Sequence, residues 1–158
     1  MNRTFVIGIY TANILSALRQ LGNKRPYPSA EYPQIKVFYP FRLTKKIFDE
    51  TGEKYARNFA PYRIFRSQIK DSQNRIFMMV RPSLQNDLIN CELHDGLFIY
   101  SIGQEYRESN YQHNFEQQLK EYGFETAFYH TGGHASSEYI EKVIIGLSPK
   151  IIVPIRTL

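Results

Sequence analysis

The chain has 158 residues, enough for one domain with a hydrophobic core, and its formal net charge is +5. A single cysteine, Cys91, excludes an internal disulfide and a cysteine-rich zinc site, and it fits a reducing, cytoplasmic compartment. No apolar run reaches the length of a membrane span. Tyr10, Thr11 and Asn13 interrupt the apolar run at 5–9, which argues against a signal peptide.

Strand and helix patterns alternate along the chain. In order, we expect a strand at 5–9, a helix at 11–21, a proline-rich loop at 23–34, a strand at 35–39 and an interrupted helical stretch at 44–69. Strands at 75–80 and 96–101 follow, with a short helix between them, and then a helix at 110–122. The chain closes with a buried strand at 125–129, a helix between Ser136 and the stop signals Gly146 and Pro149, and a second buried strand at 151–155.

This alternation predicts an α/β fold, in which a mostly parallel sheet carries helices on both faces. Ligands of such sheets bind beyond the carboxyl ends of the strands. The residues there are nearly all polar and none is acidic, so this edge suits an anion such as a phosphate. Its candidate phosphate-binding residues include Arg81, Ser83 and Ser101. The alternative is that these polar residues are loop residues and helix caps.

The segment His130-Thr131-Gly132-Gly133-His134 lies between the strand at 125–129 and the last predicted helix. Its glycines favour a tight turn, with backbone N–H groups that point at an anion before the helix. Thr131, Gly132 and Gly133 are therefore candidate phosphate-binding residues, and Arg156 could add a charge-assisted contact. His130 and His134 are candidate catalytic residues, since a histidine can donate a proton to a leaving phosphate oxygen. The alternative is a glycine turn with two hydrogen-bonded histidines.

The excess positive charge lies in the middle of the chain. Residues 36–81 hold eleven Lys and Arg against four Asp and Glu, whereas the remainder holds nine against eleven. Aromatic residues alternate with these cations, a mixture that can hold a phosphate backbone and stack bases. The candidate nucleic-acid contacts are Lys45, Lys46, Arg63 and Arg66. The alternative is a solvated helix face with extended basic side chains.

Four stretches resemble, in order, motifs of the metallo-β-lactamase-fold metallo-hydrolases of the β-CASP, RNA-processing kind. They are FVIGIYTANILSAL (5–18), RIFMMVRPSLQNDL (75–88), GLFIYSIGQEYRES (96–109) and HTGGHASSEYIEKVIIGLSPKIIVPIRT (130–157). The family's last motif reads approximately H-T-S-G-H-A-S and later P-I-H-T. The resemblance covers only the C-terminal part of the family. It implies a β-CASP-like region at 1–124 and a strand-helix-strand segment of the hydrolase core at 125–158, in one compact unit.

The resemblance also implies a catalytic role for His134, which matches the family histidine thought to assist at the scissile phosphate. Three departures bear on activity. The chain has no H-x-H motif, so the family's H-x-H-x-D-H metal cluster is absent. Arg156 stands where the family has a zinc-ligating histidine, and a guanidinium cannot ligate a cation. Gly8 replaces a usual Asp, and the family's S-M-W reads Ser101-Ile102-Gly103.

A catalytic zinc needs three protein ligands, so we expect no metal and no cofactor in this chain alone, although the family it resembles is zinc-dependent. Three interpretations remain open. The first is a truncated or degenerate hydrolase that acts on RNA or another phosphodiester and is inactive alone. The second is a nucleic-acid-binding or partner subunit, completed by another chain with the metal-binding half. The third is a small Rossmann-like nucleotide-binding domain. None implies a membrane, and an uncovered sheet face would favour self-association.

Overall fold

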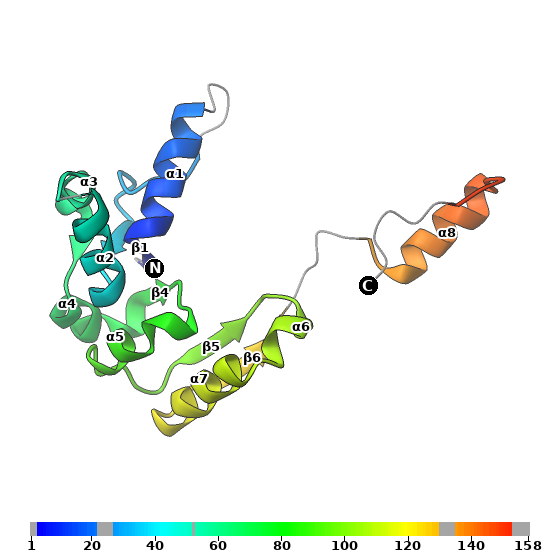
Figure 1. Ribbon diagram of the computed structural model, residues 1–158. Helices are drawn as coiled ribbons and strands as arrows, with labels where there is room; N and C mark the ends of the chain where they lie inside the picture. Colours follow the sequence, from blue (N-terminus) through cyan, green and yellow to red (C-terminus); the bar gives the residue numbers. More distant parts are fainter. Residues whose placement is uncertain (1–2, 22–26, 52, 130–134, 153–158) are drawn as a thin grey trace.

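The computed structural model describes residues 3–21, 27–51, 53–129 and 135–152, and Figure 1 shows their arrangement. The strands are β1 Thr4–Gly8, β2 Ile35–Phe38, β3 Arg63–Ile64, β4 Ile76–Met78, β5 Leu97–Tyr100 and β6 Glu125–Phe128. The α-helices are α1 Ile9–Leu21, α2 Phe41–Thr51, α3 Lys54–Arg57, α4 Arg66–Asp71, α5 Gln85–Ile89, α6 Gln104–Arg107, α7 Asn110–Glu121 and α8 Ser137–Leu147. Short 3₁₀ helices are η1 Ala60–Tyr62, η2 Gln73–Arg75 and η3 Pro82–Leu84.

The described strands form two sheets. The first has the order β3-β2-β1-β4, and the second pairs β5 with β6. Each of these pairings is parallel, and Phe5 of β1 lies opposite both Ile35 of β2 and Phe77 of β4. The predicted α/β class with a parallel sheet is confirmed. Among the described helices, none has the length and apolar character needed to span a membrane.

The central strand β1 is buried on both faces, as expected for a parallel sheet that helices cover on two sides. Ile7, which is 1% exposed, packs in one cluster with Ala12 of α1 and Ala56 of α3. The neighbouring Val6, which is fully buried, packs in another cluster with Ile69 of α4. Successive side chains of a strand point to opposite faces, so α1 and α3 cover one face of this sheet and α4 covers the other.

A third apolar cluster covers one face of β5. Phe98 of β5 meets Phe115 of α7 edge to face, with ring centroids 5.6 Å apart and the ring planes at 90°. Met78 of β4 packs against this cluster and also against the cluster around Val6. The two sheets therefore share apolar contacts although they are not hydrogen-bonded to each other.

The middle of the chain differs from the predicted helical stretch at 44–69. α2 begins at Phe41, and the 3₁₀ helix at Ala60–Tyr62 leads directly into β3. β3 consists only of Arg63 and Ile64, which pair with β2. Two residues are too few to show the alternating pattern of a strand, and Pro61 suggested only a helix break. The strand exists because β2 offers an open edge at that point.

The closing unit is less buried than predicted. β6 is exposed or half-buried along its length rather than a buried strand. Ile151 and Ile152 are exposed and lie outside any strand, and the rest of the predicted strand at 151–155 falls outside the described residues. α8 begins after Ser136, as predicted, and the Ser136 side chain accepts a hydrogen bond from the Tyr139 N–H. The helix continues through Gly146 and ends at Leu147.

α8 carries an apolar stripe that the described part of the chain does not cover. Ile140, Val143 and Leu147 are 44–74% exposed, and Figure 1 shows α8 apart from both sheets. Leu97 and Ile99, on the second face of β5, are also exposed. Within the described residues, the prediction of helices on both faces therefore holds for β1 and not for β5.

Phe115→Ala should lower the free energy of unfolding by about 3–5 kcal/mol, because it removes a ring that is 1% exposed and leaves a cavity between α7 and β5. Tyr111→Ala is the matched control on the same helix, since Tyr111 is 58% exposed, and it should cost less than about 1 kcal/mol. Urea titrations of both variants measure the difference. Equal losses in the two variants would show that α7 does not pack on β5 as described.

Candidate nucleic-acid interface

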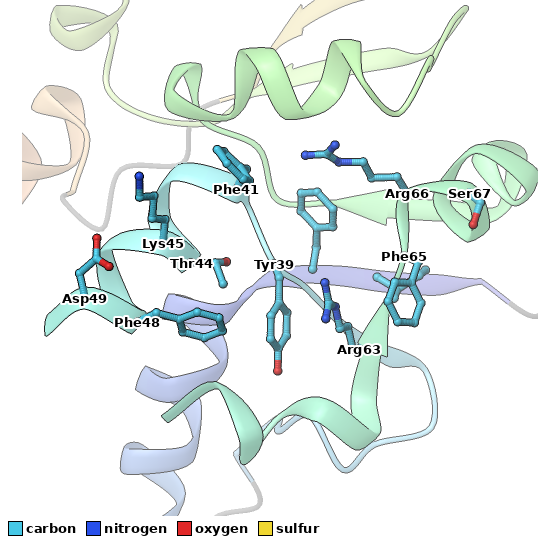
Figure 2. A pocket seen from close by; sticks show the side chains of 12 residues that line it. Tyr39, Phe41, Thr44, Lys45, Phe48, Asp49, Arg63, Phe65, Arg66 and Ser67 are labelled. Atoms are coloured by element: carbon cyan, nitrogen blue, oxygen red, sulfur yellow. The ribbon is translucent and has the colours of Figure 1, made fainter. Parts of the chain in front are cut away.

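A cavity of about 690 Å³ opens at the carboxyl ends of β2 and β3 (Figure 2). Its walls come from the end of β2, from α2, from β3 and from the start of α4. We call it the aromatic–basic pocket, and its lining residues are Phe38, Tyr39, Phe41, Thr44, Lys45, Phe48, Asp49, Arg63, Ile64, Phe65, Arg66 and Ser67. This is the edge at which parallel α/β sheets bind ligands.

Arg63 lies between two aromatic rings of the pocket (Figure 2). Its guanidinium carbon is 4.6 Å from the ring centroid of Tyr39 and 4.7 Å from that of Phe65. Tyr39 is fixed, because it is buried and its hydroxyl donates a hydrogen bond to the Ala56 carbonyl. Burial raises the pKa of the Tyr39 hydroxyl, so it is a neutral donor at pH 7. Phe65 is 53% exposed, which leaves its ring accessible to a stacking partner.

A buried carboxylate holds Arg66, the first residue of α4. An amino nitrogen (Nη2) of the Arg66 guanidinium lies 2.9 Å from Oδ1 of Asp87, and the same oxygen accepts a hydrogen bond of 3.1 Å from the Phe41 N–H. The Asp87 side chain is 7% exposed and comes from α5, whereas the Arg66 side chain is 42% exposed. Asp87 therefore ties together the first residues of α2 and α4, which belong to two walls of the pocket.

The charge of the pocket is positive. Lys45, Arg63 and Arg66 line it together with a single acid, Asp49. Among the described residues, neither Lys45 nor Arg63 forms an ion pair. The hydroxyl oxygen of Thr44 is buried and has no hydrogen-bond partner in the described part of the chain.

The structure brings together three of the four predicted nucleic-acid contacts. Lys45, Arg63 and Arg66 line the pocket, whereas Lys46 lies outside its lining and pairs with Glu50 at 3.7 Å. The sequence alone did not indicate that Tyr39, Phe41, Phe48 and Asp87 contribute to the pocket. The predicted end of a strand at residue 39 was the available signal for Tyr39 and Phe41. Nothing local in the sequence marks Asp87, because its partners are distant along the chain.

The predicted phosphate-binding residues Arg81 and Ser83 line a separate hollow of about 330 Å³. Its other lining residues are Pro82, Tyr100, Ile102, Tyr106, Ser109, Tyr111 and Gln112. Ser101 is exposed directly after β5 and does not line this hollow. The structure thus brings together Arg81 and Ser83 and leaves Ser101 outside the lining of this hollow.

The remaining predicted site residues lie outside the described residues. They are His130, Thr131, Gly132, Gly133, His134 and Arg156. Their roles in phosphate binding and proton transfer stay predictions.

Comparisons with protein-family models, with curated proteins and with solved structures give no match to this chain. The family resemblance therefore rests on the sequence motifs alone.

The described part of the chain does not suit a catalytic zinc ion. Nowhere within it do three His, Cys, Asp or Glu side chains gather closely enough to hold a metal. Burial raises the pKa of the Cys91 thiol to about 11, which disfavours the thiolate form that ligates metals. Outside the described residues, the sequence adds only one pair of histidines, His130 and His134.

We therefore expect the purified protein, prepared without a metal-binding tag, to contain well below one zinc ion per chain, since three ligands are the minimum for a catalytic site. Elemental analysis after dialysis measures the zinc content. Arg156→His should leave the zinc content unchanged, because one added histidine does not replace the missing cluster. One tightly held zinc ion per chain would contradict this prediction.

Proposed function

We propose that this chain binds single-stranded RNA through the aromatic–basic pocket, as the substrate-contacting part of a β-CASP-type metallo-hydrolase. One observation carries the proposal: Lys45, Arg63 and Arg66 meet exposed aromatic rings in one cavity at the carboxyl ends of β2 and β3. Cations hold the phosphates of a single strand, while aromatic rings stack its unpaired bases. A duplex would not present its base faces in this way, so the pocket favours single strands.

The hydrolase part of the proposal is supported by the order of the four motifs and by the parallel α/β fold. We propose that the chain is truncated or degenerate with respect to that family and inactive alone, because its ligands do not suffice for a catalytic metal. A unit that carries the H-x-H-x-D-H cluster would complete it. The exposed apolar stripe of α8, which includes Ile140, Val143 and Leu147, is a surface that this unit would cover.

Binding is tested with a fluorescent single-stranded RNA and anisotropy measurements at increasing salt. The parent should bind at low salt, and its affinity should fall steeply as salt rises, because bound phosphates release counterions. Reversing Lys45, Arg63 and Arg66 to Glu should reduce the affinity by about 100-fold or more, since each change removes one cation and adds one anion.

Lys46→Glu is the matched control for the RNA-binding test, since it makes the same charge change on α2 outside the pocket. It should reduce the affinity by less than about fivefold. Circular dichroism confirms that each variant is folded. Absence of binding by the parent at low salt, or equal effects of the control and the triple variant, would contradict the proposal. Tight binding of a mononucleotide, without a gain for longer RNA, would favour the nucleotide-binding interpretation instead.

A separate prediction concerns the catalytic activity of the isolated chain. The chain should not cleave the bound RNA with or without added zinc, because it cannot assemble the metal-activated water that such hydrolases use. Gel analysis of end-labelled RNA after long incubation measures this. Zinc-dependent cleavage that survives rigorous purification would show that the chain is an enzyme by itself.

A further inference from the structure

We infer that Asp87 is a positioning residue of the aromatic–basic pocket, which presents Arg66 to a phosphate of the bound strand. The inference rests on the proposed RNA binding and adds a role for a residue outside the lining of the pocket. Asp87 lies on α5, which follows β4, whereas the pocket is built at the ends of β2 and β3.

Asp87 is buried, so its carboxylate needs hydrogen-bond partners inside the fold. Its side chain is 7% exposed, and a carboxylate in such a place is costly unless it accepts hydrogen bonds. Oδ1 receives two of them, from Arg66 at 2.9 Å and from the Phe41 N–H at 3.1 Å. The carboxylate is thus held from two sides, and it holds both donors in return.

Arg66 remains able to bind a ligand in this arrangement. Its side chain is 42% exposed and lines the pocket, and one amino nitrogen of the guanidinium is committed to Asp87. The planar group carries further N–H donors in a fixed fork, which matches the geometry of a phosphate. A lysine at this position would keep the charge and lose the fork.

The second hydrogen bond of Asp87, from the Phe41 N–H, fixes the backbone at the start of α2. Phe41 is the first residue of α2 and is 67% exposed. Figure 2 shows the Arg66 guanidinium directed toward the side of the pocket where Phe41 lies. One carboxylate therefore anchors both a candidate phosphate contact and the backbone of a residue whose side chain is exposed to the pocket.

The charge of Asp87 and its positioning role predict opposite results when the charge is removed. By electrostatics alone, the loss of a negative charge beside the pocket should strengthen the binding of RNA. If Asp87 positions Arg66, the same loss should weaken binding. Asp49→Asn supplies the matched control, because Asp49 lines the same pocket and the change removes the same charge.

The experiment measures RNA affinity against salt for the parent, Asp87→Asn and Asp49→Asn. We expect Asp87→Asn to weaken binding by about five- to tenfold and to reduce the salt slope by about 0.7, the value for one lost phosphate contact on a single strand. Asp49→Asn should bind at least as tightly as the parent with the same slope. If Asp87→Asn tightens binding as Asp49→Asn does, the inference is wrong while the proposed function stands.

Arg66→Lys keeps the inference testable if Asp87→Asn fails to fold, since it leaves Asp87 with a charged partner. It should weaken RNA binding by about fivefold or more, because the fork is lost while the charge is kept. In an Arg66→Ala background, Asp87→Asn should have no further effect on affinity. Parent-like binding by Arg66→Lys, or additive effects in the double variant, would overturn the inference. Failure of the parent itself to bind RNA would remove both the inference and the proposed function.

Discussion

The pairing of β3 with β2 is the constraint on which the site depends. Only Val37 with Arg63 and Phe38 with Ile64 are in register, yet this pairing sets where both strands end. Parallel strands end at the same edge of a sheet, so the turn into α2 and the turn into α4 are brought together there. The aromatic–basic pocket is the space between these two turns and the helices that follow them.

A buried charge stabilises this edge. Asp87 reaches from α5 to both turns. Its carboxylate accepts hydrogen bonds from the N–H groups of Phe41 and Arg66, which take the place of hydrogen bonds from water. Removing one partner of a buried ion pair costs more folding free energy than the pair itself contributes, because the remaining charge stays buried without a partner. The position of α5 is itself set by the core, in which Leu88 packs with Phe98 and Phe115.

The apolar core is unevenly covered. β1 has helices on both of its faces, whereas one face of β5 and the stripe of α8 are exposed to solvent. Contiguous exposed apolar surfaces are typical of interaction sites. Under the proposed function, the metal-binding unit would cover these surfaces, and the aromatic–basic pocket would contact the RNA.

The sequence by itself determined the α/β class, because strand patterns and helix patterns alternate and each is a local property of the chain. α1 and α8 follow from apolar spacing and, for α8, from the serine that caps it. The sequence also located the excess of cations at 36–81 and proposed Lys45, Lys46, Arg63 and Arg66 as contacts.

The tertiary structure alone decided which of these cations share a site. β3 is too short to show a pattern, and it forms only because β2 provides hydrogen-bond partners for Arg63 and Ile64. Lys46 is next to Lys45 in the sequence and yet lies outside the pocket, because neighbouring residues of a helix point in different directions. Asp87 joins the site through two hydrogen bonds that connect distant segments, and no local pattern in the sequence can encode such contacts.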